Sequence, residues 1–585
     1  MSGKPSSGTD RERIKNELCA RCMGGLDNGT SGMEKIDFRQ LAEADFQVVV
    51  IGLGPVGITL CNLLGSFGIS VLGIDARDDV FALPRAIGMD HEVMRVFQGL
   101  GVADDIASVV GEYRDSEYRA ADGTLLRRFI SPARPHKLGW PAYLTFVQPP
   151  LERILRDKAR NLPTVTIMTG VEMVSLDDPA SPRLLIREID TGDTMSVNAT
   201  FVVGCDGGNS FVRRTLDIGF EDLVFDQPWL VIDVVLGDEE VNLPETNVQF
   251  CNPARPHTFV VLPGNLRRWE FMLLPGETAE MINQPERIWE LLSPWLKPGQ
   301  AEIWRSATYR FHALVAESWR KGNVFLAGDA CHMTPPFLAQ GMVQGIKDAS
   351  NLGWKIARVL QGGPAKLLDT YEQERRPLVH KVISITKSLG EVICEIDQER
   401  AEARNAAMKA LVAEGKGTVV RQSLFPPIAD GAIGFASNGQ PVPGAGEVCP
   451  QPRVVVGGKS ILFDDVLGND FVVIAKGLNI TDPVRNQLTQ LAIALFEFGV
   501  ADGFEEEEDM FESWLSERGF RAIVVRPDRV IFGAISDESE LTMLLEQLAG
   551  WAAYANDDHG RTTALGHRSR HSDRPHPASP RSPPT

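Results

Sequence analysis

The chain of 585 residues lacks the features that mark membrane, secreted and nucleic-acid-binding proteins. No stretch approaches the roughly 18 consecutive apolar residues of a membrane-spanning helix. The polar start, MSGKPSSGTDRERIKNEL, has no apolar core of a secretory signal. Acidic residues (78) outnumber Lys and Arg (59), so the formal net charge is −19. Because phosphate binding needs clustered cations, this charge argues against nucleic acid as a partner.

Cysteine is scarce as well, with eight residues spread along the chain. Several of them, such as Cys61, Cys205 and Cys251, lie inside apolar segments, which is typical of reduced thiols and predicts a cytoplasmic protein. Cys19 and Cys22 form an isolated C-x-x-C pair without further ligands nearby. The sequence therefore predicts no metal site.

What the chain does have is a strand–helix–strand unit near its start. The apolar run FQVVVIGLG predicts a buried strand, PVGITLCNLLGSFG a helix, and ISVLGIDA a second strand. Gly52, Gly54 and Gly57 give G-x-G-x-x-G spacing, which allows a tight turn, close approach of a pyrophosphate and close helix packing. Asp75 ends the second strand, where a carboxylate can accept ribose hydroxyls. This unit predicts a dinucleotide site.

Two further polar motifs follow predicted strands. In CDGGNSFVRR, Asp206 and Arg213 are suited to bracket a phosphate, or else form a capped turn with a surface arginine. In AGDACHMTPPFLAQGMVQG, Asp329 leaves a strand beside Gly328 and could bind polyol hydroxyls. Bare backbone around Gly341 could donate N–H groups to an anionic ring edge.

In this order, the three motifs resemble those of the group A flavoprotein monooxygenases, aromatic hydroxylases related to p-hydroxybenzoate and phenol hydroxylase. The resemblance covers roughly residues 46–377 and implies FAD as cofactor. It implies that Asp329 holds the ribityl chain and that the amides of Met342 and Val343 lie near the flavin pyrimidine edge. The implied cofactor-binding residues are Gly52, Gly54, Gly57, Asp75, Arg85, Gln148, Asp206, Arg213, Gly328, Asp329, Gly341, Met342 and Val343.

One departure from the family pattern lies in the third motif. The family commonly reads GQGMN where this chain has AQGMV, from Ala339 to Val343. A backbone amide at Val343 can still serve as a donor, so we expect FAD binding to survive. The departure leaves the position of the flavin ring and the shape of the cleft open.

The resemblance also implies the residues around the substrate. Pro335 and Pro336 would form a rigid wall where the substrate meets the flavin, and Arg268 matches an arginine that approaches the flavin, although a surface ion pair is an equal alternative. Arg255 and His257 lie on a sheet expected to line the cleft, where either could meet a carboxylate; an exposed arginine and a loop histidine are the alternatives. Trp140 and Tyr143 could stack on an aromatic ring or simply pack in the core.

The predicted fold is α/β: a Rossmann-like FAD-binding domain interleaved with an antiparallel substrate-binding sheet, followed by a thioredoxin-like module. The expected divisions are a flexible extension (1–44), the FAD-binding domain (45–390) with the sheet at about 110–140 and 221–312, a helical segment and linker (391–445), the module (446–552) and a disordered tail (553–585). The module has no internal C-x-x-C, so we expect it to be structural or oligomer-forming.

Within the family, PRAIGMDHE, WLVIDV and LLDTYEQERRP resemble the branch of 3-(3-hydroxyphenyl)propionate hydroxylases. This implies that NADH or NADPH reduces FAD and that a flavin C4a-hydroperoxide hydroxylates a phenolic substrate at the ortho position. The expected partners are a small aromatic compound and O2, with a homodimer as a possible assembly. The alternatives are a polyketide-tailoring hydroxylase of a larger phenol and a non-catalytic FAD-binding protein.

Overall fold

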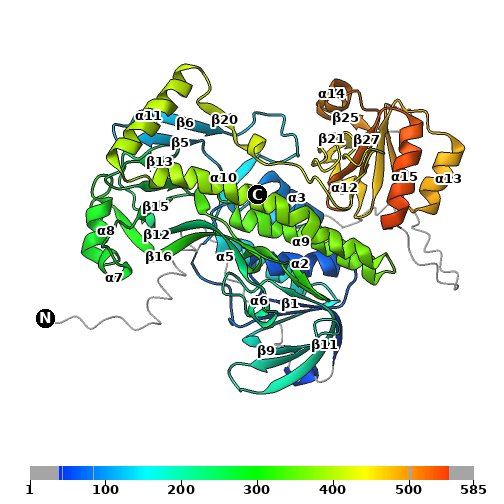
Figure 1. The fold of residues 1–585 in the computed structure, drawn as a ribbon, viewed down its shortest axis with the longest axis horizontal. Coiled ribbons are helices and arrows are strands. Elements are labelled where there is room, and N and C mark those ends of the chain that lie inside the picture. The colour runs from blue at the N-terminus through cyan, green and yellow to red at the C-terminus, as the bar shows by residue number, and fades with distance from the viewer. Residues whose placement is uncertain (1–37, 42–43, 84, 500–503, 553–585) are drawn as a thin grey trace, which may run out of the picture.

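A computed structural model describes residues 38–41, 44–83, 85–499 and 504–552 of the protein. Almost all of the expected N-terminal extension, with Cys19 and Cys22, and the expected C-terminal tail lie outside the described residues. Figure 1 shows three parts: an α/β unit around a parallel sheet, a large curved antiparallel sheet, and a separate C-terminal module. No helix in the described ranges is long and apolar enough to cross a membrane.

The first sheet has eight strands and is parallel at its centre. Its central strands are buried runs of β-branched residues, as expected of a sheet covered on both faces. The predicted strand–helix–strand unit is present as β1, α2 and β2. The sheet consists of β17 (Arg320–Lys321), β18 (Val324–Leu326), β11 (Thr194–Gly204), β1 (Asp45–Ile51), β2 (Val71–Asp75) and β8 (Val165–Thr169), with β10 (Arg183–Glu188) paired to β11 and β9 (Val171–Asp177) paired to β10.

The second sheet has nine strands, mostly antiparallel, and alternates side chains between two covered faces. One face meets the α/β unit and the other is covered by α7 (Ala279–Ile282) and α8 (Pro285–Leu292). The order is β19 (His332–Met333), β16 (Ala301–Ala316), β12 (Phe220–Leu236), β15 (Leu266–Met272), β14 (His257–Val261), β13 (Asn247–Cys251), β5 (Ser116–Ala120), β6 (Leu125–Ile130) and β20 (Thr418–Val420).

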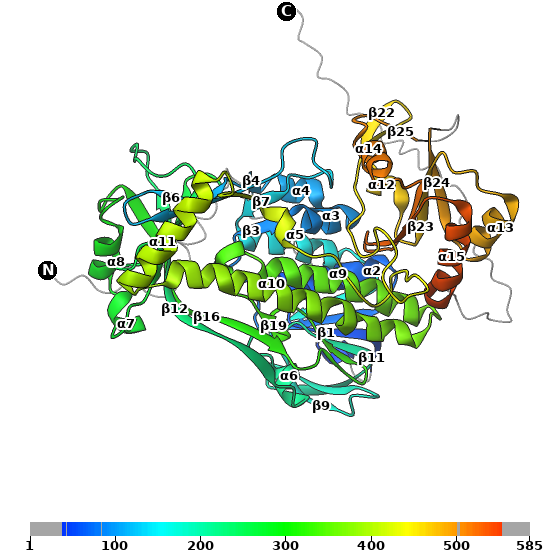
Figure 2. The same cartoon turned by 45° about the horizontal axis from the view of Figure 1, so that its top comes forward.

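Long helices join these two sheets. In the α/β unit α2 packs against α9 and α5, and in Figure 2 α10 crosses the molecule from the large sheet toward the C-terminal module. A small sheet between the two large ones is formed by β3 (Gly88–Asp90), β7 (Tyr143–Phe146) and β4 (Val110–Glu112). The helices of this part are α2 (Pro55–Ser66), α3 (His91–Gly99), α4 (Ala103–Ala107), α5 (Gln148–Arg160), α6 (Phe211–Thr215), α9 (Gly341–Leu360), α10 (Thr370–Cys394) and α11 (Gln398–Ala413), and the 3-10 helices are η1 (Phe38–Leu41), η2 (Gly328–Ala330), η3 (Pro336–Leu338), η4 (Ala365–Asp369) and η5 (Arg421–Leu424).

The C-terminal module is built on a four-stranded sheet in the order β24-β23-β26-β27. β23 and β24 are parallel, and β26 and β27 are antiparallel to their neighbours. The elements are β21 (Arg453–Val456), β22 (Lys459–Leu462), α12 (Asp464–Leu467), β23 (Val472–Lys476), α13 (Asp482–Gln490), β24 (Ala494–Phe498), β25 (Glu505–Glu506), α14 (Met510–Glu517), β26 (Ala522–Val525), β27 (Ile531–Ile535) and α15 (Glu538–Ala552).

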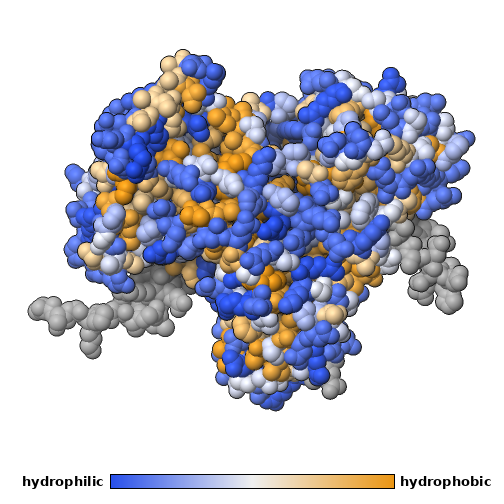
Figure 3. Space-filling view, viewed as in Figure 1, coloured by the Kyte–Doolittle hydropathy of each residue, from blue (hydrophilic) through white to orange (hydrophobic). Residues whose placement is uncertain are grey.

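Buried ion pairs attach this module to the α/β unit. Arg95 of α3 forms a two-pronged pair with Asp464, with distances of 2.5 and 2.8 Å. Arg526 of the module donates to Glu374 of α10 at 2.8 Å, and both side chains are fully buried. Since a buried charge is costly without its partner, these pairs fix the module in place. In Figure 3 polar side chains cover much of the face in view, while apolar ones gather below α11.

Candidate functional site

The glycine turn between β1 and α2 is packed tightly on one side and open on the other. Gly52 has φ +93°, and a Cβ there would lie 2.6 Å from the Cys205 carbonyl oxygen. At Gly57 a Cβ would lie 1.9 Å from the Gly52 carbonyl oxygen. By contrast, a Cβ at Gly54 would meet no protein atom within 4 Å. The first and third glycines are therefore required by the fold, and the second leaves backbone facing open space.

Asp75, at the end of β2, holds the turn from the other side. Its carboxylate accepts hydrogen bonds from the Leu53 amide at 2.8 Å and from the Arg77 amide at 2.9 Å. Buried Arg156 lies 3.8 Å from it and donates to the Leu53 carbonyl at 3.2 Å. The Nε and Nη1 atoms of Arg156 are buried without a partner among the described residues. The carboxylate keeps free acceptor capacity for ribose hydroxyls.

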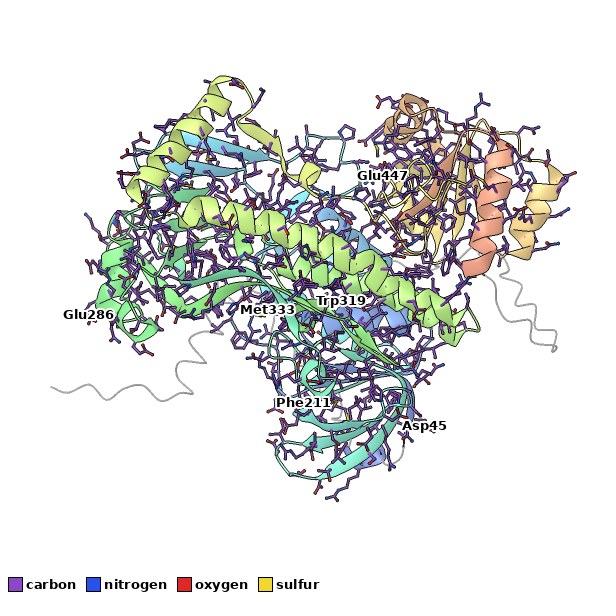
Figure 4. The ribbon with its side chains drawn as sticks, in the orientation of Figure 1. Asp45, Phe211, Glu286, Trp319, Met333 and Glu447 are labelled. Carbon is purple, nitrogen blue, oxygen red and sulfur yellow. The ribbon has the colours of Figure 1, made fainter. Side chains whose placement is uncertain are left out.

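The second motif is connected directly to the third. Asp206 accepts from the amides of Phe211 and Val212 at the start of α6, while its other oxygen is buried without a partner in the described part of the chain. Arg213 donates to the carbonyls of Gly208 and Ala330 at 3.0 and 3.2 Å. It thus bridges the two motifs. A Cβ at Gly208 would lie 2.9 Å from the Met333 side chain, and Figure 4 shows Met333 above Phe211 of α6.

The loop that carries Asp329 is held by a buried charged network. Asp348 of α9 accepts from the Gly328 amide at 3.1 Å, from the His332 ring at 2.7 Å and from Arg375 at 2.9 Å. Although burial opposes ionisation, His332 and Arg375 lower the pKa of Asp348. The Asp329 side chain takes no part in this network and is exposed. The side chains of Cys331, His332 and Asp348 lie close enough together to bind one metal ion. The Asp348 carboxylate already accepts a hydrogen bond from Arg375, which argues against a metal there.

The start of α9 offers free backbone donors next to this loop. Its first intrahelical bond runs from the Gln344 amide to the Gln340 carbonyl, and no side chain caps the helix. The amides of Gly341, Met342 and Val343 therefore have no intrahelical partner. A Cβ at Gly341 would meet nothing within 4 Å, and the same is true of Gly207 in the second motif. Open glycine backbone in all three motifs, two uncapped helix starts and orphaned polar atoms fit a long, anionic dinucleotide such as FAD.

Arg85, Gln148 and Arg268, which are far apart in sequence, lie together. The Gln148 side-chain oxygen accepts from the amides of Arg85 and Ala86 at 3.1 and 2.9 Å. Arg268 of β15 donates to the Arg85 carbonyl at 3.1 Å. Arg268 thus joins the large sheet to the cofactor side of the α/β unit.

On the same face of the large sheet lies a cluster of buried charges. Arg268 forms a two-pronged pair with Asp233 at 2.6 and 3.0 Å, and Arg305 lies 3.3 Å from Asp233. Glu270 lies 3.8 Å from Arg268, and burial raises its pKa. The sequence analysis did not single out Asp233, Glu270 or Arg305. WLVIDVV and RRWEFM place charged residues among apolar ones within predicted strands. Because successive side chains of a strand point to opposite faces, this pattern could have indicated a charged face.

The loop containing Pro335 and Pro336 is held by Tyr143 and by Arg421, which the sequence analysis also missed. The Tyr143 hydroxyl donates to the carbonyls of Leu338 and Ala339, at 3.0 and 3.1 Å. Arg421, from the segment after α11, donates to the Leu338 carbonyl and stacks 3.9 Å from the Tyr143 ring centre. Ala339 has φ +47°, a conformation that alanine rarely adopts. These contacts stabilise the strained loop directly before α9.

Arg255 and His257 lie apart from these groups. Arg255 forms a two-pronged pair with Glu277 at 2.6 and 2.7 Å, so its guanidinium is already occupied by a carboxylate. His257 packs between Phe250 and Phe271 on the face of the sheet covered by α8, and burial lowers its pKa to about 4. The reason is the two-residue period of β14, which sends His257 and Thr258 to opposite faces. This placement does not favour the expected contacts of Arg255 and His257 with a substrate.

Trp140 is also remote from the Arg268 cluster. Its indole N–H donates to Gln98 of α3 at 2.9 Å, and Gln98 in turn bonds Asp465 of the C-terminal module. Near this interface a cavity of about 620 Å³ separates α3 and α9 from the module. It contains none of the expected cofactor residues, and the charged groups at its edge, such as Arg95 and Lys347, are paired. We therefore place the candidate site at the three motifs and not in this cavity.

Comparison with known proteins identifies the family. A model described as the FAD binding domain matches residues 45–386, more than half of the chain. The chain belongs to the FAD-dependent aromatic hydroxylases. A second model, described as the HcaD C-terminal domain, matches residues 446–550. FAD is accordingly the cofactor of this family, and the matched residues include all three motifs.

Relatives of this hydroxylase align over almost their full length. A probable NADH-specific resorcinol 4-hydroxylase from Rhodococcus jostii is 34% identical over 86% of this chain and 95% of its own length. A 3-(3-hydroxy-phenyl)propionate/3-hydroxycinnamic acid hydroxylase from Klebsiella pneumoniae is 30% identical over 90% of this chain and 98% of its own. Among solved structures, the flavin-dependent monooxygenase PieE matches with a TM-score of 0.74 and 20% identity, covering 87% of this chain and 99% of PieE. This last likeness shows the shared fold.

Proposed function

We propose that the protein is a single-component monooxygenase that uses FAD and NADH or NADPH to hydroxylate a small phenolic substrate, ortho to its hydroxyl group. One observation carries the proposal: the cofactor motifs and the buried polar face of the large sheet are joined through Arg268, which bonds the Arg85 backbone at 3.1 Å and Asp233 at 2.6 Å. A polar sheet face opposite the flavin site can orient a ring that carries hydroxyl groups.

On the cofactor side, we assign the binding of the dinucleotide to the glycine turn, Asp75 and the start of α2. Asp329 would hold the ribityl chain, and the amides of Met342 and Val343 would bind the flavin ring edge. Arg85, Gln148, Asp206 and Arg213 would complete this site. When bound, FAD supplies the redox chemistry that reduces O2 with electrons from the nicotinamide donor.

On the substrate side, the protein has to orient the ring and exclude water. Pro335 and Pro336 are rigid and precede the strained Ala339, so they form a fixed edge beside the helix start of α9. Tyr143 and Arg421 hold this edge from behind. Arg268 places a guanidinium on the facing sheet, where it would stabilise negative charge on the phenolic ring.

For the substrate, we infer a phenol that carries a second polar group, of the kind named for the relatives: 3-(3-hydroxyphenyl)propionate or resorcinol. One observation favours the compound without a carboxylate. Arg255 and His257 were candidates for contact with a carboxylate, but Arg255 is bound by Glu277 and His257 lies on the other face of the sheet. The name of the Rhodococcus relative also favours NADH over NADPH as donor.

For the C-terminal module, residues 446–552, we infer a thioredoxin-like fold without redox activity. The supporting observations are the strand order β24-β23-β26-β27, the parallel pair at β23 and β24, and the helices α13 and α15. The described part of the module holds one cysteine, Cys449, which is buried, so a dithiol pair is absent there. Its role would be to support α3 and α10 through buried ion pairs.

The test is aerobic oxidation of NADH and NADPH by the FAD-loaded protein, with 3-(3-hydroxyphenyl)propionate, with resorcinol and without either. Oxidation stimulated by one of them, with a product heavier by one oxygen atom, supports the proposal and selects the substrate. Stimulation with hydrogen peroxide as the only product would identify an effector instead of a substrate. Stoichiometric FAD without stimulation by these or larger phenols would contradict the proposal and favour a non-catalytic FAD-binding protein.

A further inference from the structure

The buried carboxylate of Glu270 has no evident structural role. Its side chain is 10% exposed and lies on the polar face of the large sheet. No described residue donates a hydrogen bond to it; its nearest charged contact is the Arg268 guanidinium at 3.8 Å. Arg268 in turn is engaged with both oxygens of Asp233. A nearly buried carboxylate without a donor is costly for a protein to keep, so the position calls for a donor from outside the chain.

The strand register places Glu270 in front of the candidate flavin site. Glu270 pairs with Val231, which lies between Trp229 and Asp233 on β12. On one side of it, the Trp229 ring lies 5.8 Å from Phe337 in the loop after Pro336. On the other side, Arg268 bonds the Arg85 backbone at 3.1 Å. Glu270 thus lies between two of the points at which the sheet touches the α/β unit.

The neighbours of Glu270 on this face are polar and neutral. Thr258 and Gln249 follow it across β14 and β13, and Tyr118 follows on β5. The Thr258 hydroxyl donates to Gln249 at 2.7 Å, so this pair is already satisfied. The Tyr118 hydroxyl is buried without a partner among the described residues. Within this row, Glu270 carries the one carboxylate, so it is the group suited to accept a proton.

We propose that Glu270 is a catalytic residue that accepts the hydrogen bond, and then the proton, of the aromatic hydroxyl group of the substrate. The inference rests on the proposed hydroxylase function. The O–H bond of the phenol breaks, the proton moves to a Glu270 carboxylate oxygen, and the electron pair stays on the phenolic oxygen. The ring becomes more electron-rich, and Arg268 remains beside the transferred negative charge. The proton returns to that oxygen once the ring has been hydroxylated.

Burial supports this role because it raises the pKa of Glu270, despite the opposing effect of Arg268. A general base is most effective when its pKa lies near the working pH. Burial moves the pKa of Glu270 toward that pH from the lower value of an exposed carboxylate. The charged groups that face Glu270 from the same sheet are Arg268, Asp233 and Arg305, and with the Glu270 carboxylate their formal charges sum to zero.

The experiment compares wild type with Glu270→Gln, which keeps the size of the side chain and removes the proton acceptor. Glu302→Gln, an exposed carboxylate of the same sheet, is the matched control. With the phenol that stimulates the wild type, we expect Glu270→Gln to form hydroxylated product about 100-fold more slowly at pH 7. Its rate should rise toward pH 10, as the phenol ionises unaided near its pKa of about 10. Glu302→Gln should keep the wild-type rate and pH profile.

A binding measurement gives a second readout. Flavin absorbance is titrated with 3-(3-hydroxyphenyl)propionate and with its methyl ether, 3-(3-methoxyphenyl)propionate, or with resorcinol and 3-methoxyphenol. The wild type should bind the phenol about tenfold more tightly than the ether, and Glu270→Gln should lose this preference. If Glu270→Gln loses FAD or melts early, Glu270→Asp replaces it; that variant keeps the carboxylate and should keep both the preference and a measurable rate.

Three results would overturn the assignment, and the first two separate it from the proposed function. If the wild type hydroxylates a phenol but Glu270→Gln does so with the same rate and pH profile, only the role of Glu270 is wrong. The same holds if the wild type binds the ether as tightly as the phenol. If the wild type neither binds nor hydroxylates any phenol tested, the proposed function is wrong and the role of Glu270 falls with it.

Discussion

The two faces of the nine-stranded sheet are built from the same strands but differ sharply in chemistry. The face toward the α/β unit carries Arg268, Asp233 and Glu270, all nearly buried. The face covered by α8 carries Trp269 and Phe271, with Trp295 from the segment after α8 packed on them. Buried charge on one face and dense aromatic packing on the other indicate that the first face serves a ligand and the second holds the fold together.

This comparison explains why neighbouring residues in sequence have unrelated roles. His257 and Thr258 are adjacent, yet His257 stacks on Phe250 at 4.3 Å while Thr258 joins the polar row beside Glu270. A strand places successive side chains on opposite faces, so one step along the chain changes the environment completely. Figure 4 shows how far the α8 side extends, with Glu286 at the outer edge and Met333 near the centre.

The largest effect is expected at the cofactor loop, outside both faces. Asp329→Ala should purify with most of its FAD lost, because the exposed carboxylate is the proposed ligand of the ribityl chain. His257→Ala, on the aromatic face, should retain FAD. The FAD content per protein, read from the absorbance spectrum, measures the difference. Equal FAD content in the two variants would contradict the placement of Asp329 at the cofactor.

The polar face should affect both stability and activity. Arg268→Met leaves Arg305 as the remaining described cation near Asp233, and breaking such a buried pair costs about 4 kcal/mol of unfolding free energy. Phenol-dependent NADH oxidation should also be lost at temperatures where the variant is folded. Trp269→Ala should lose about 3 kcal/mol by leaving a cavity, but keep activity per folded molecule. Denaturant unfolding measures the loss of stability in each variant, and steady-state assays measure the loss of activity. If both variants lost activity, the two faces of the sheet would not differ in function.

The aromatic face should have its own pH dependence through His257. Burial lowers the pKa of this histidine to about 4, below the ordinary 6.5. The unfolded chain therefore binds the proton more readily, and stability is full above pH 6.5 and falls as the pH drops toward 4, by up to about 3 kcal/mol. In His257→Phe this part of the acid sensitivity should disappear. Unfolding free energies of both proteins at pH 7 and pH 4.5 provide the measurement; equal losses would show that His257 does not titrate.

The smallest effect is expected from Arg255, which the sequence suggested as a substrate contact. Its pair with Glu277 is partly exposed, so Arg255→Gln should cost about 1 kcal/mol of stability. The Michaelis constant for the aromatic substrate should change less than twofold or so, because the guanidinium is already occupied by Glu277. A large increase of this constant for a carboxylated substrate alone, without change for resorcinol, would place Arg255 at the substrate after all.

Local patterns predicted the strand–helix–strand unit and the FAD family, because the glycine turn depends on the backbone over short distances. Gly52 and Gly57 are required where a Cβ would collide with backbone oxygens, and that need is visible in spacing alone. The FAD family and the hydroxylase class followed from the same motifs and are confirmed by the family match. The residues that hold the motifs, such as Asp348 and Arg375, were not predicted, because each acts on a loop distant from it in sequence.

The sequence by itself determined the dinucleotide turn, the order of the three motifs and the alternating strands, since each depends on neighbours within a few residues. The face of each strand that meets the α/β unit was decided by the tertiary structure alone. It brought Arg268 to Arg85, Arg421 to Leu338 and Glu270 between the cofactor loops, over separations of up to 183 residues. The physical reason is that strand register and long-range packing select the face, and neither is encoded in a local pattern.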